Sequence, residues 1–308
     1  MTAPLSIDAA TAAADQALFP GFRPFRQVVN GVEIAGVIGG SGPPLLLLHG
    51  HPQSHVIWHK VARDLMRDYT VVATDLRGYG ASSKPPGSAR HAEYSKRTMA
   101  QDQVDVMRAL GFGRFRLCAH DRGARVAHRL CVDHPAHVER AMLLDIAPTL
   151  AMYEHTDMAF ASAYWHWFFL IQPSPFPETL INATPDFYIG KLIGLRHAGL
   201  DPFAPEAMAT YAAAMREPAC VHAMCEDYRA AATIDLEHDR ADRSAGKRVS
   251  VPLRVLWGEH GVIQRCFKPL ELWQAVADDV SGGTVPCGHY VPEEAPEALL
   301  AEMRAFFA

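Results

Sequence analysis

RLCAHDRGAR, residues 116–125, is the stretch that decides the fold of this chain. Its first half predicts the end of a buried strand and its second half the start of a helix, with a tight turn at Asp121 between them. Ala119 and Gly123 are the small residues that allow the backbone to bend sharply at this turn. Aspartate often caps a helix, but a strand–turn–helix of this kind presents its central side chain as a nucleophile, and we expect that role for Asp121.

A carboxylate nucleophile indicates a particular kind of reaction. It attacks an alkyl carbon and forms an ester intermediate, whereas serine or cysteine at the same position would transfer an acyl group. The sequence contains no G-x-S-x-G segment, so a serine hydrolase has no motif here.

Strand-like and helix-like segments alternate along most of the chain, which predicts an α/β fold with a mostly parallel central sheet flanked by helices. The clearest segments are a hairpin at Asn30-Gly31, buried strands at 45–48, 141–144 and 253–257, and a terminal helix at 296–307. The alternation stops after Pro148, and the aromatic and helical segments that follow indicate an inserted helical cap. We therefore expect residues 1–147 and 249–308 to form one core and residues 148–248 the cap.

Composition limits the possible partners. The formal net charge is −5, so no overall basic field favours nucleic acid or an acidic membrane. Residues 1–15 lack the cationic start and apolar centre of a signal peptide, and no apolar run has the length of a membrane span. None of the six cysteines belongs to a C-x-x-C pair, which is typical of reduced thiols in a cytoplasmic protein.

The proposed nucleophile needs a general base. His289 follows the last predicted strand on a loop, which is where a strand–turn–helix nucleophile of this kind finds its base. Asp145 comes directly after an apolar strand and could hold the His289 ring in the correct tautomer. Glu259 is the rival acid because it ends the following strand, and we favour Asp145 for its shorter side chain.

Two arginines lie on the first turn of the helix after the nucleophile. Arg122 and Arg125 are three residues apart and therefore share one side of that helix. Arginines on helices usually form surface salt bridges, but a helix N-terminus that faces a site already favours anions. We expect this pair to bind a substrate carboxylate.

The loop at residues 49–52 follows a strand and precedes a helix. Loops in this position can donate a backbone N–H to an oxyanion, and the N–H groups of His51 and Arg122 are the candidates. A metal site is the alternative, with His49, His51, His55 and His59 as ligands. No carboxylate lies close to them in the sequence, so we expect no metal.

The predicted cap contains His166, Trp167 and Tyr228. Aromatic runs in a cap usually serve packing. A halide leaving group, however, needs hydrogen-bond donors, and imidazole, indole and phenol supply them. The residues alone leave both interpretations open.

Several longer segments resemble the fluoroacetate (haloacetate) dehalogenases of the α/β-hydrolase superfamily. The match covers most of the chain, in HGHPQSHVIWHK, DLRGYGASSKPP, HDRGARVAHRL, LLDIAPT, AYWHWFFLIQPSPFPE, CEDYRAAATIDLEHD and GHYVPEEAPE. The HDRG-x-R and YWHW elements together are specific, whereas HGxP alone is not. Ala124, His51 and Leu195 differ from the family pattern, where glycine, an apolar residue and, in some members, tryptophan stand.

The resemblance implies a cofactor-free haloacetate dehalogenase, expected as a homodimer. It assigns Asp121 as nucleophile, His289 as base and Asp145 as its partner. It also implies that Arg122 and Arg125 bind the substrate carboxylate and that His166, Trp167 and Tyr228 form a fluoride pocket.

Two rival functions remain at this point. An epoxide hydrolase would use the same Asp121 and His289, with Tyr228 and either Tyr164 or Tyr153 to protonate the epoxide oxygen. The arginine pair argues against it, because that pair suits an anion. A non-catalytic ligand receptor is the second rival, and the intact set of Asp121, Asp145 and His289 argues against it.

Overall fold

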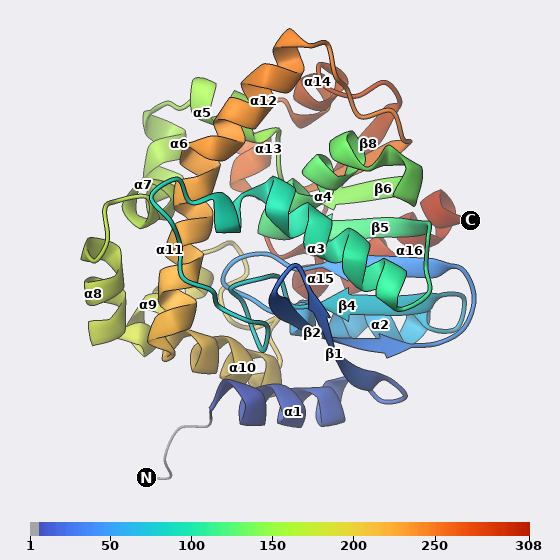
Figure 1. Cartoon of the computed structure of the whole chain (residues 1–308), viewed down its shortest axis with the longest axis horizontal. Helices are drawn as coiled ribbons and strands as arrows, with labels where there is room; N and C mark the ends of the chain where they lie inside the picture. Colours follow the sequence, from blue (N-terminus) through green and yellow to red (C-terminus); the bar gives the residue numbers. More distant parts are fainter. Residues whose placement is uncertain (1–5) are drawn as a thin grey trace.

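The computed structural model describes residues 6–308, which contain an eight-stranded sheet in the order β1-β2-β4-β3-β5-β6-β7-β8 (Figure 1). β2 pairs antiparallel with both β1 and β4, and all other pairs are parallel. The prediction of a mostly parallel sheet is therefore confirmed. The strands are β1 (Arg23–Val29), β2 (Val32–Gly39), β3 (Pro44–Leu48), β4 (Thr70–Thr74), β5 (Phe115–His120), β6 (Val138–Leu144), β7 (Leu253–Gly258) and β8 (Val280–Val285).

Local sequence explains the form of these strands. Asn30 and Gly31 both have positive φ, 47° and 71°, as a two-residue hairpin turn between β1 and β2 requires. Leu45–Leu48 of β3 have no exposed surface, because the strand pairs with β4 and β5 and helices cover both faces of the sheet. A continuous apolar run is typical of such a doubly covered parallel strand.

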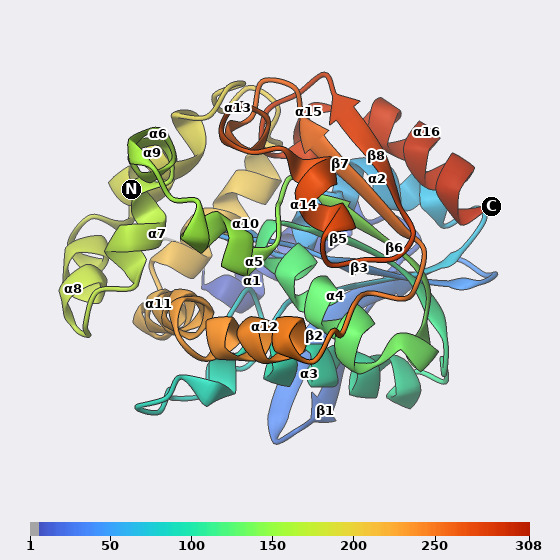
Figure 2. The same cartoon turned by 90° about the horizontal axis from the view of Figure 1, so that it is seen from above.

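Helices lie on both sides of the sheet, with α2 and α16 on one side and α3 and α4 on the other (Figure 2). The helices outside the cap are α1 (Ile7–Leu18), α2 (His59–Leu65), α3 (Lys96–Ala109), α4 (Asp121–Asp133), α13 (Val262–Cys266), α14 (Pro269–Gln274), α15 (Val291–Glu294) and α16 (Pro296–Phe307). Three short 3₁₀ helices occupy His55–Trp58, Ala92–Tyr94 and Pro135–His137. None of the helices within residues 6–308 combines the length and apolar character that crossing a membrane requires.

Between β6 and β7 the described chain forms eight helices and no strand. They gather beside one end of the sheet in both views (Figures 1 and 2), and we call them the cap. They are α5 (Thr149–Glu154), α6 (Met158–Ala163), α7 (Trp165–Leu170), α8 (Phe176–Ala183), α9 (Pro185–Gly194), α10 (Pro205–Met215), α11 (Pro218–Ala232) and α12 (Ile234–Ser244).

The sequence analysis missed helix α1. Alanine occurs in many kinds of segment, and the alanines of α1 form no clear apolar stripe. In the structure the Ser6 hydroxyl accepts a hydrogen bond from the Ala9 N–H at 3.3 Å and caps the helix, which packs against α10. Burial of Ala10 and Ala14 at that contact, rather than propensity alone, explains why α1 is stable here.

Candidate active site

The turn between β5 and α4 holds Asp121 in a strained backbone conformation. Its φ is 45°, a value that residues other than glycine rarely adopt. The turn also needs small neighbours, because a Cβ atom at Gly123 would lie 2.3 Å from the His49 carbonyl oxygen. A Cβ atom at Gly50 would lie 2.5 Å from the Asp121 Cβ. Strain of this kind concentrates at functional sites.

His289 and Asp145 meet Asp121 at the carboxyl ends of the strands. The His289 Nδ1–H donates a hydrogen bond to Asp145 Oδ2 at 2.5 Å, and Nε2 lies 3.9 Å from Asp121 Oδ2. The Gly258 N–H donates to the other Asp145 oxygen at 2.9 Å and fixes the carboxylate. Glu259, the rival acid, is exposed and forms no such contact. The structure thus brings Asp121, Asp145 and His289 together.

Charge around Asp121 keeps its carboxylate ionised. Burial alone would raise the pKa of Asp121, but the nearby His289, His120, Arg125 and Arg122 outweigh burial and hold it below its usual range. An ionised carboxylate is already nucleophilic and needs no base. The 3.9 Å gap to His289 Nε2 therefore suits a base that acts on a water molecule rather than on Asp121 itself.

The two oxyanion candidates lie on either side of the nucleophile. The His51 N–H donates a hydrogen bond to Asp121 Oδ1 at 3.0 Å, and Arg122 follows Asp121 at the helix start. The His51 ring packs on Tyr228, with 5.2 Å between ring centroids. Burial lowers the pKa of His51 to about 3, so its ring is neutral.

Arg122 and Arg125 are both buried, so surface salt bridging does not describe them. Arg122 donates from Nε and Nη2 to the two carboxylate oxygens of Asp227, each at 2.9 Å, and its Nη1 has no partner within residues 6–308. Arg125 donates to the Thr149 hydroxyl at 2.9 Å, and its Nε likewise has no partner in the described part of the chain. A buried donor without a partner is costly, and an anionic ligand would satisfy both.

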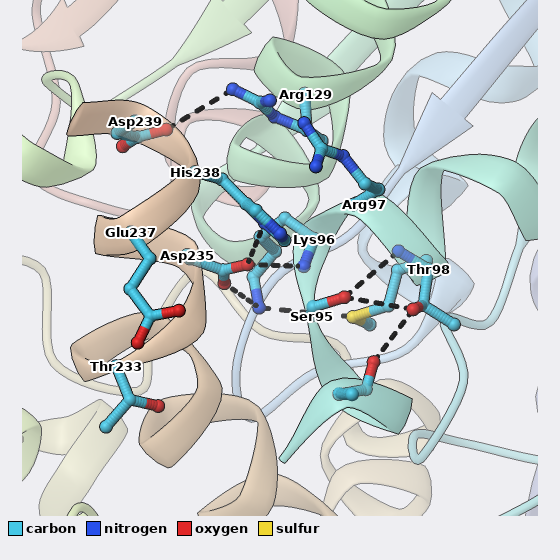
Figure 3. Close-up of polar contacts among 12 residues, drawn as sticks. Ser95, Lys96, Arg97, Thr98, Arg129, Thr233, Asp235, Glu237, His238 and Asp239 are labelled. Atoms are coloured by element: carbon cyan, nitrogen blue, oxygen red, sulfur yellow. Dashed lines mark hydrogen bonds and ion pairs between the residues drawn. The ribbon is translucent and has the colours of Figure 1, made fainter. Parts of the chain in front are cut away.

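Asp227 is a site residue that the sequence analysis missed. It accepts from Arg122 and, at 2.6 Å, from the Tyr79 hydroxyl, and it forms a close ion pair with Lys96 Nζ. Lys96 in turn faces Asp235 of helix α12, whose carboxylate accepts its backbone N–H at 2.9 Å (Figure 3). This network ties core helix α3 to the cap and fixes the orientation of Arg122. The only sequence signal was the position of Asp227 directly before Tyr228.

His166, Trp167 and Tyr228 come together in the cap. The His166 and Tyr228 ring centroids are 6.0 Å apart, and those of Trp167 and Tyr228 are 6.4 Å apart. Trp167 Nε1 and His166 Nδ1 are buried without a hydrogen-bond partner among the residues that the structure describes. Trp167 and Tyr228 also adjoin the arginines, because Arg125 stacks on Trp167 at 4.7 Å and Arg122 stacks on Tyr228 at 4.1 Å.

His120 and Arg196 were also missed. The His120 Nε2–H donates to the His289 backbone carbonyl at 2.8 Å and holds the base loop, and burial lowers its pKa to about 4. Arg196 stacks on the ring of Tyr164 at 4.7 Å, and that ring lies 6.3 Å from His289. His120 begins the HDRG-x-R element, but nothing in that element indicates its contact with the His289 loop, and Arg196 belongs to no motif.

Three of the four histidines of the alternative metal site have other partners, whereas the His51 ring nitrogens are buried without a hydrogen-bond partner among the described residues. His49 Nε2 accepts the Leu76 N–H at 3.0 Å, and the His55 ring lies between Asp15 and Asp75, at 2.8 Å from each. The His59 Nδ1–H donates to the Val56 carbonyl at 2.9 Å. Residues 6–308 hold no group of three or more His, Cys, Asp or Glu side chains arranged to bind a metal ion.

Comparison with known proteins identifies the family of this chain. The family model for the alpha/beta hydrolase fold matches residues 43–295, and the chain belongs to this family. The structure of an alpha/beta hydrolase from Nostoc sp. PCC 7120 superimposes with a TM-score of 0.92 at 52% identity, over 94% of this chain and 99% of that one.

Two relatives are similar to this chain over most of its length. A fluoroacetate dehalogenase from a Burkholderia species is 45% identical over 94% of this chain and 95% of its own length. A soluble epoxide hydrolase from Corynebacterium sp. (strain C12) is 32% identical over 92% of this chain and 96% of its own length. The similarity therefore spans the core and the cap in both cases.

Proposed function

We propose that this protein is a hydrolytic haloacetate dehalogenase that converts fluoroacetate to glycolate and fluoride. The observation that favours this function most is the pair of unused guanidinium donors, Arg122 Nη1 and Arg125 Nε, beside an ionised carboxylate nucleophile. The 45% identity to a fluoroacetate dehalogenase supports it. Asp121, His289 and water supply every reacting group, so we propose no cofactor.

In the first step the arginines hold the substrate carboxylate and Asp121 attacks the α-carbon. A C–O bond forms as the carbon–halogen bond breaks, and the halide leaves with the bonding electron pair. The product of this step is the carboxymethyl ester of Asp121. His166, Trp167 and Tyr228 donate to the halogen as negative charge develops on it, and these donors act most strongly in the transition state.

In the second step water hydrolyses the ester. His289 Nε2 accepts a proton from the water as its oxygen attacks the Asp121 carbonyl carbon, and Asp145 stabilises the imidazolium that forms. The N–H groups of His51 and Arg122 stabilise the oxyanion. Collapse breaks the ester bond and releases glycolate, whose hydroxyl oxygen comes from the Asp121 carboxylate and takes the proton held by His289. The Asp121 carboxylate is restored with one oxygen from water.

Epoxide hydrolysis is the second candidate. The Tyr153 and Tyr164 hydroxyls are buried without a hydrogen-bond partner in residues 6–308, and tyrosine hydroxyls in such a site would protonate an epoxide oxygen. The Corynebacterium relative is an epoxide hydrolase. An uncharged epoxide, however, would leave two buried guanidinium donors without a partner, so haloacetate is the better substrate for this site.

A direct test compares fluoroacetate, chloroacetate and an epoxide on one enzyme preparation. We expect halide release from both acids and no diol from the epoxide. Arg122→Lys and Arg125→Lys keep the positive charge but lose the planar guanidinium fork. Each should lower kcat/KM for the acids by an amount that corresponds to about 2 kcal/mol or more of lost transition-state stabilisation.

Two outcomes would contradict the proposal. Diol formation without halide release would identify an epoxide hydrolase. Normal turnover of haloacetate by either lysine variant would show that the arginine concerned is structural.

A further inference from the structure

A cavity of about 420 Å³ leads from the surface to the catalytic base. Its walls come from cap helices α6, α7 and α9 on one side and from the chain after β7 and before α15 on the other. His166 and His289 form its inner end, and exposed Lys191, Leu195 and Arg265 line its mouth. It therefore connects solvent with the site described above.

The lining of this cavity has one sign of charge. It contains Lys191, Arg196 and Arg265 together with four histidines, and no acidic residue of the described chain lines it. The contrast with the rest of the protein is clear, because the chain has a net charge of −5. Lys268, which lines a neighbouring cavity together with Arg265, is paired with Glu271 at 3.3 Å, whereas no ion pair with a carboxylate is found in residues 6–308 for the three cations of this cavity.

We propose that this cavity is the access passage for small carboxylate anions, and that Arg196 receives the carboxylate there before Arg122 and Arg125 bind it. The inference rests on the proposed function, because it assumes that the substrate is an anion. Lys191 and Arg265 attract the anion to the mouth. Lys191, Arg196 and Arg265 take no part in the chemistry.

Arg196 lies at the right place for a transfer point. It is partly buried, and its guanidinium stacks on Tyr164 at 4.7 Å. The centroid of the Tyr164 ring lies 5.2 Å from that of His166 and 6.3 Å from that of His289. Tyr164 therefore contacts Arg196 on one face and lies next to two residues of the site. An anion at Arg196 is therefore already beside the catalytic base.

The mouth of the passage is bounded by a pair of histidines from opposite walls. His197 follows cap helix α9 and His260 follows β7, and their rings stack with 4.4 Å between centroids. Both are exposed. Their contact joins the cap to the core at this passage.

The positive charge of the passage should set the rate at which an anion binds. A cleft lined by one sign of charge raises association rates of an opposite charge by about 10- to 1,000-fold, and salt screens this effect. Removing charges at the mouth should slow association without touching the groups that bind or react. The same change elsewhere on the surface should have no such effect.

The test is stopped-flow binding of glycolate, the expected product, followed by the fluorescence of Trp165 and Trp167 at low and high salt. In the Lys191→Gln/Arg265→Gln double variant we expect the association rate at low salt to fall about tenfold and its salt dependence to flatten. Arg196→Gln should also slow association. Lys268→Gln, a matched control that removes a positive charge just outside the passage, should behave like the wild type.

The inference is wrong if the double variant or Arg196→Gln binds glycolate at the wild-type rate with the wild-type salt dependence. It is also wrong if Lys268→Gln slows binding equally. Turnover of chloroacetate by the wild type is measured separately. Absence of turnover would overturn the proposed function, whereas normal turnover with unchanged association in the variants would overturn only the passage.

Discussion

The His289→Asn variant should release one equivalent of halide per active site and then stop. Ester formation requires only Asp121 and a bound haloacetate, whereas hydrolysis of the ester requires a base at the position of His289 Nε2. We expect steady turnover to fall on the order of 10⁴-fold or more, as in other sites where a catalytic base is removed. The burst is measured as halide released per enzyme, and the adduct by the mass of the peptide that contains Asp121.

Two observations complete this experiment. Asp121→Asn is the control, and it should give neither a burst nor an adduct. The trapped peptide of the His289→Asn variant should be heavier by one carboxymethyl group, located on Asp121. Steady turnover in that variant, or an adduct on any other side chain, would contradict the assignment of base and nucleophile.

Removal of single donors in the halide pocket should reduce defluorination far more than dechlorination. Fluoride is small and strongly hydrated, and the carbon–fluorine bond is hard to break, so the leaving group depends on close donors as charge develops. Chloride leaves more readily and needs them less. Tyr228→Phe removes one donor and little volume, and Trp167→Phe removes one donor and keeps an aromatic ring. Each should lower kcat for fluoroacetate on the order of 10²-fold.

The control is Tyr188→Phe, which removes another buried cap hydroxyl, on helix α9. It should affect the two substrates equally and weakly. Both activities are measured on the same preparation of each variant. Equal losses of fluoroacetate and chloroacetate turnover in Trp167→Phe and Tyr228→Phe would mean that these rings only pack the cap.

The sheet and the nucleophile turn could be predicted because their signals are local. The apolar run of β3, the Asn30-Gly31 hairpin and the helix at Pro296–Phe307 all depend on neighbouring residues. The same holds for Asp121, since the small residues that its turn requires stand beside it in the sequence. Asp145 could also be preferred to Glu259 from the sequence, because its shorter side chain and the apolar strand directly before it can be read from one segment.

Residues that act through distant partners could not be found in this way. Asp227 and Arg122 are 105 positions apart, and only the folded cap brings them together. Arg196 lies in a cap loop with no motif and becomes meaningful only beside Tyr164 and His289. Sequence spacing also suggested that both arginines were free for substrate, whereas Asp227 occupies most of Arg122 and leaves one nitrogen available.

The central claim is that water attacks the enzyme ester and not the substrate. A single turnover of fluoroacetate in heavy-oxygen water, with enzyme in excess, tests it most directly by mass spectrometry of both products. We expect the label in the carboxylate of Asp121 and none in the glycolate. Labelled glycolate from that first turnover, with an unlabelled Asp121, would contradict the claim.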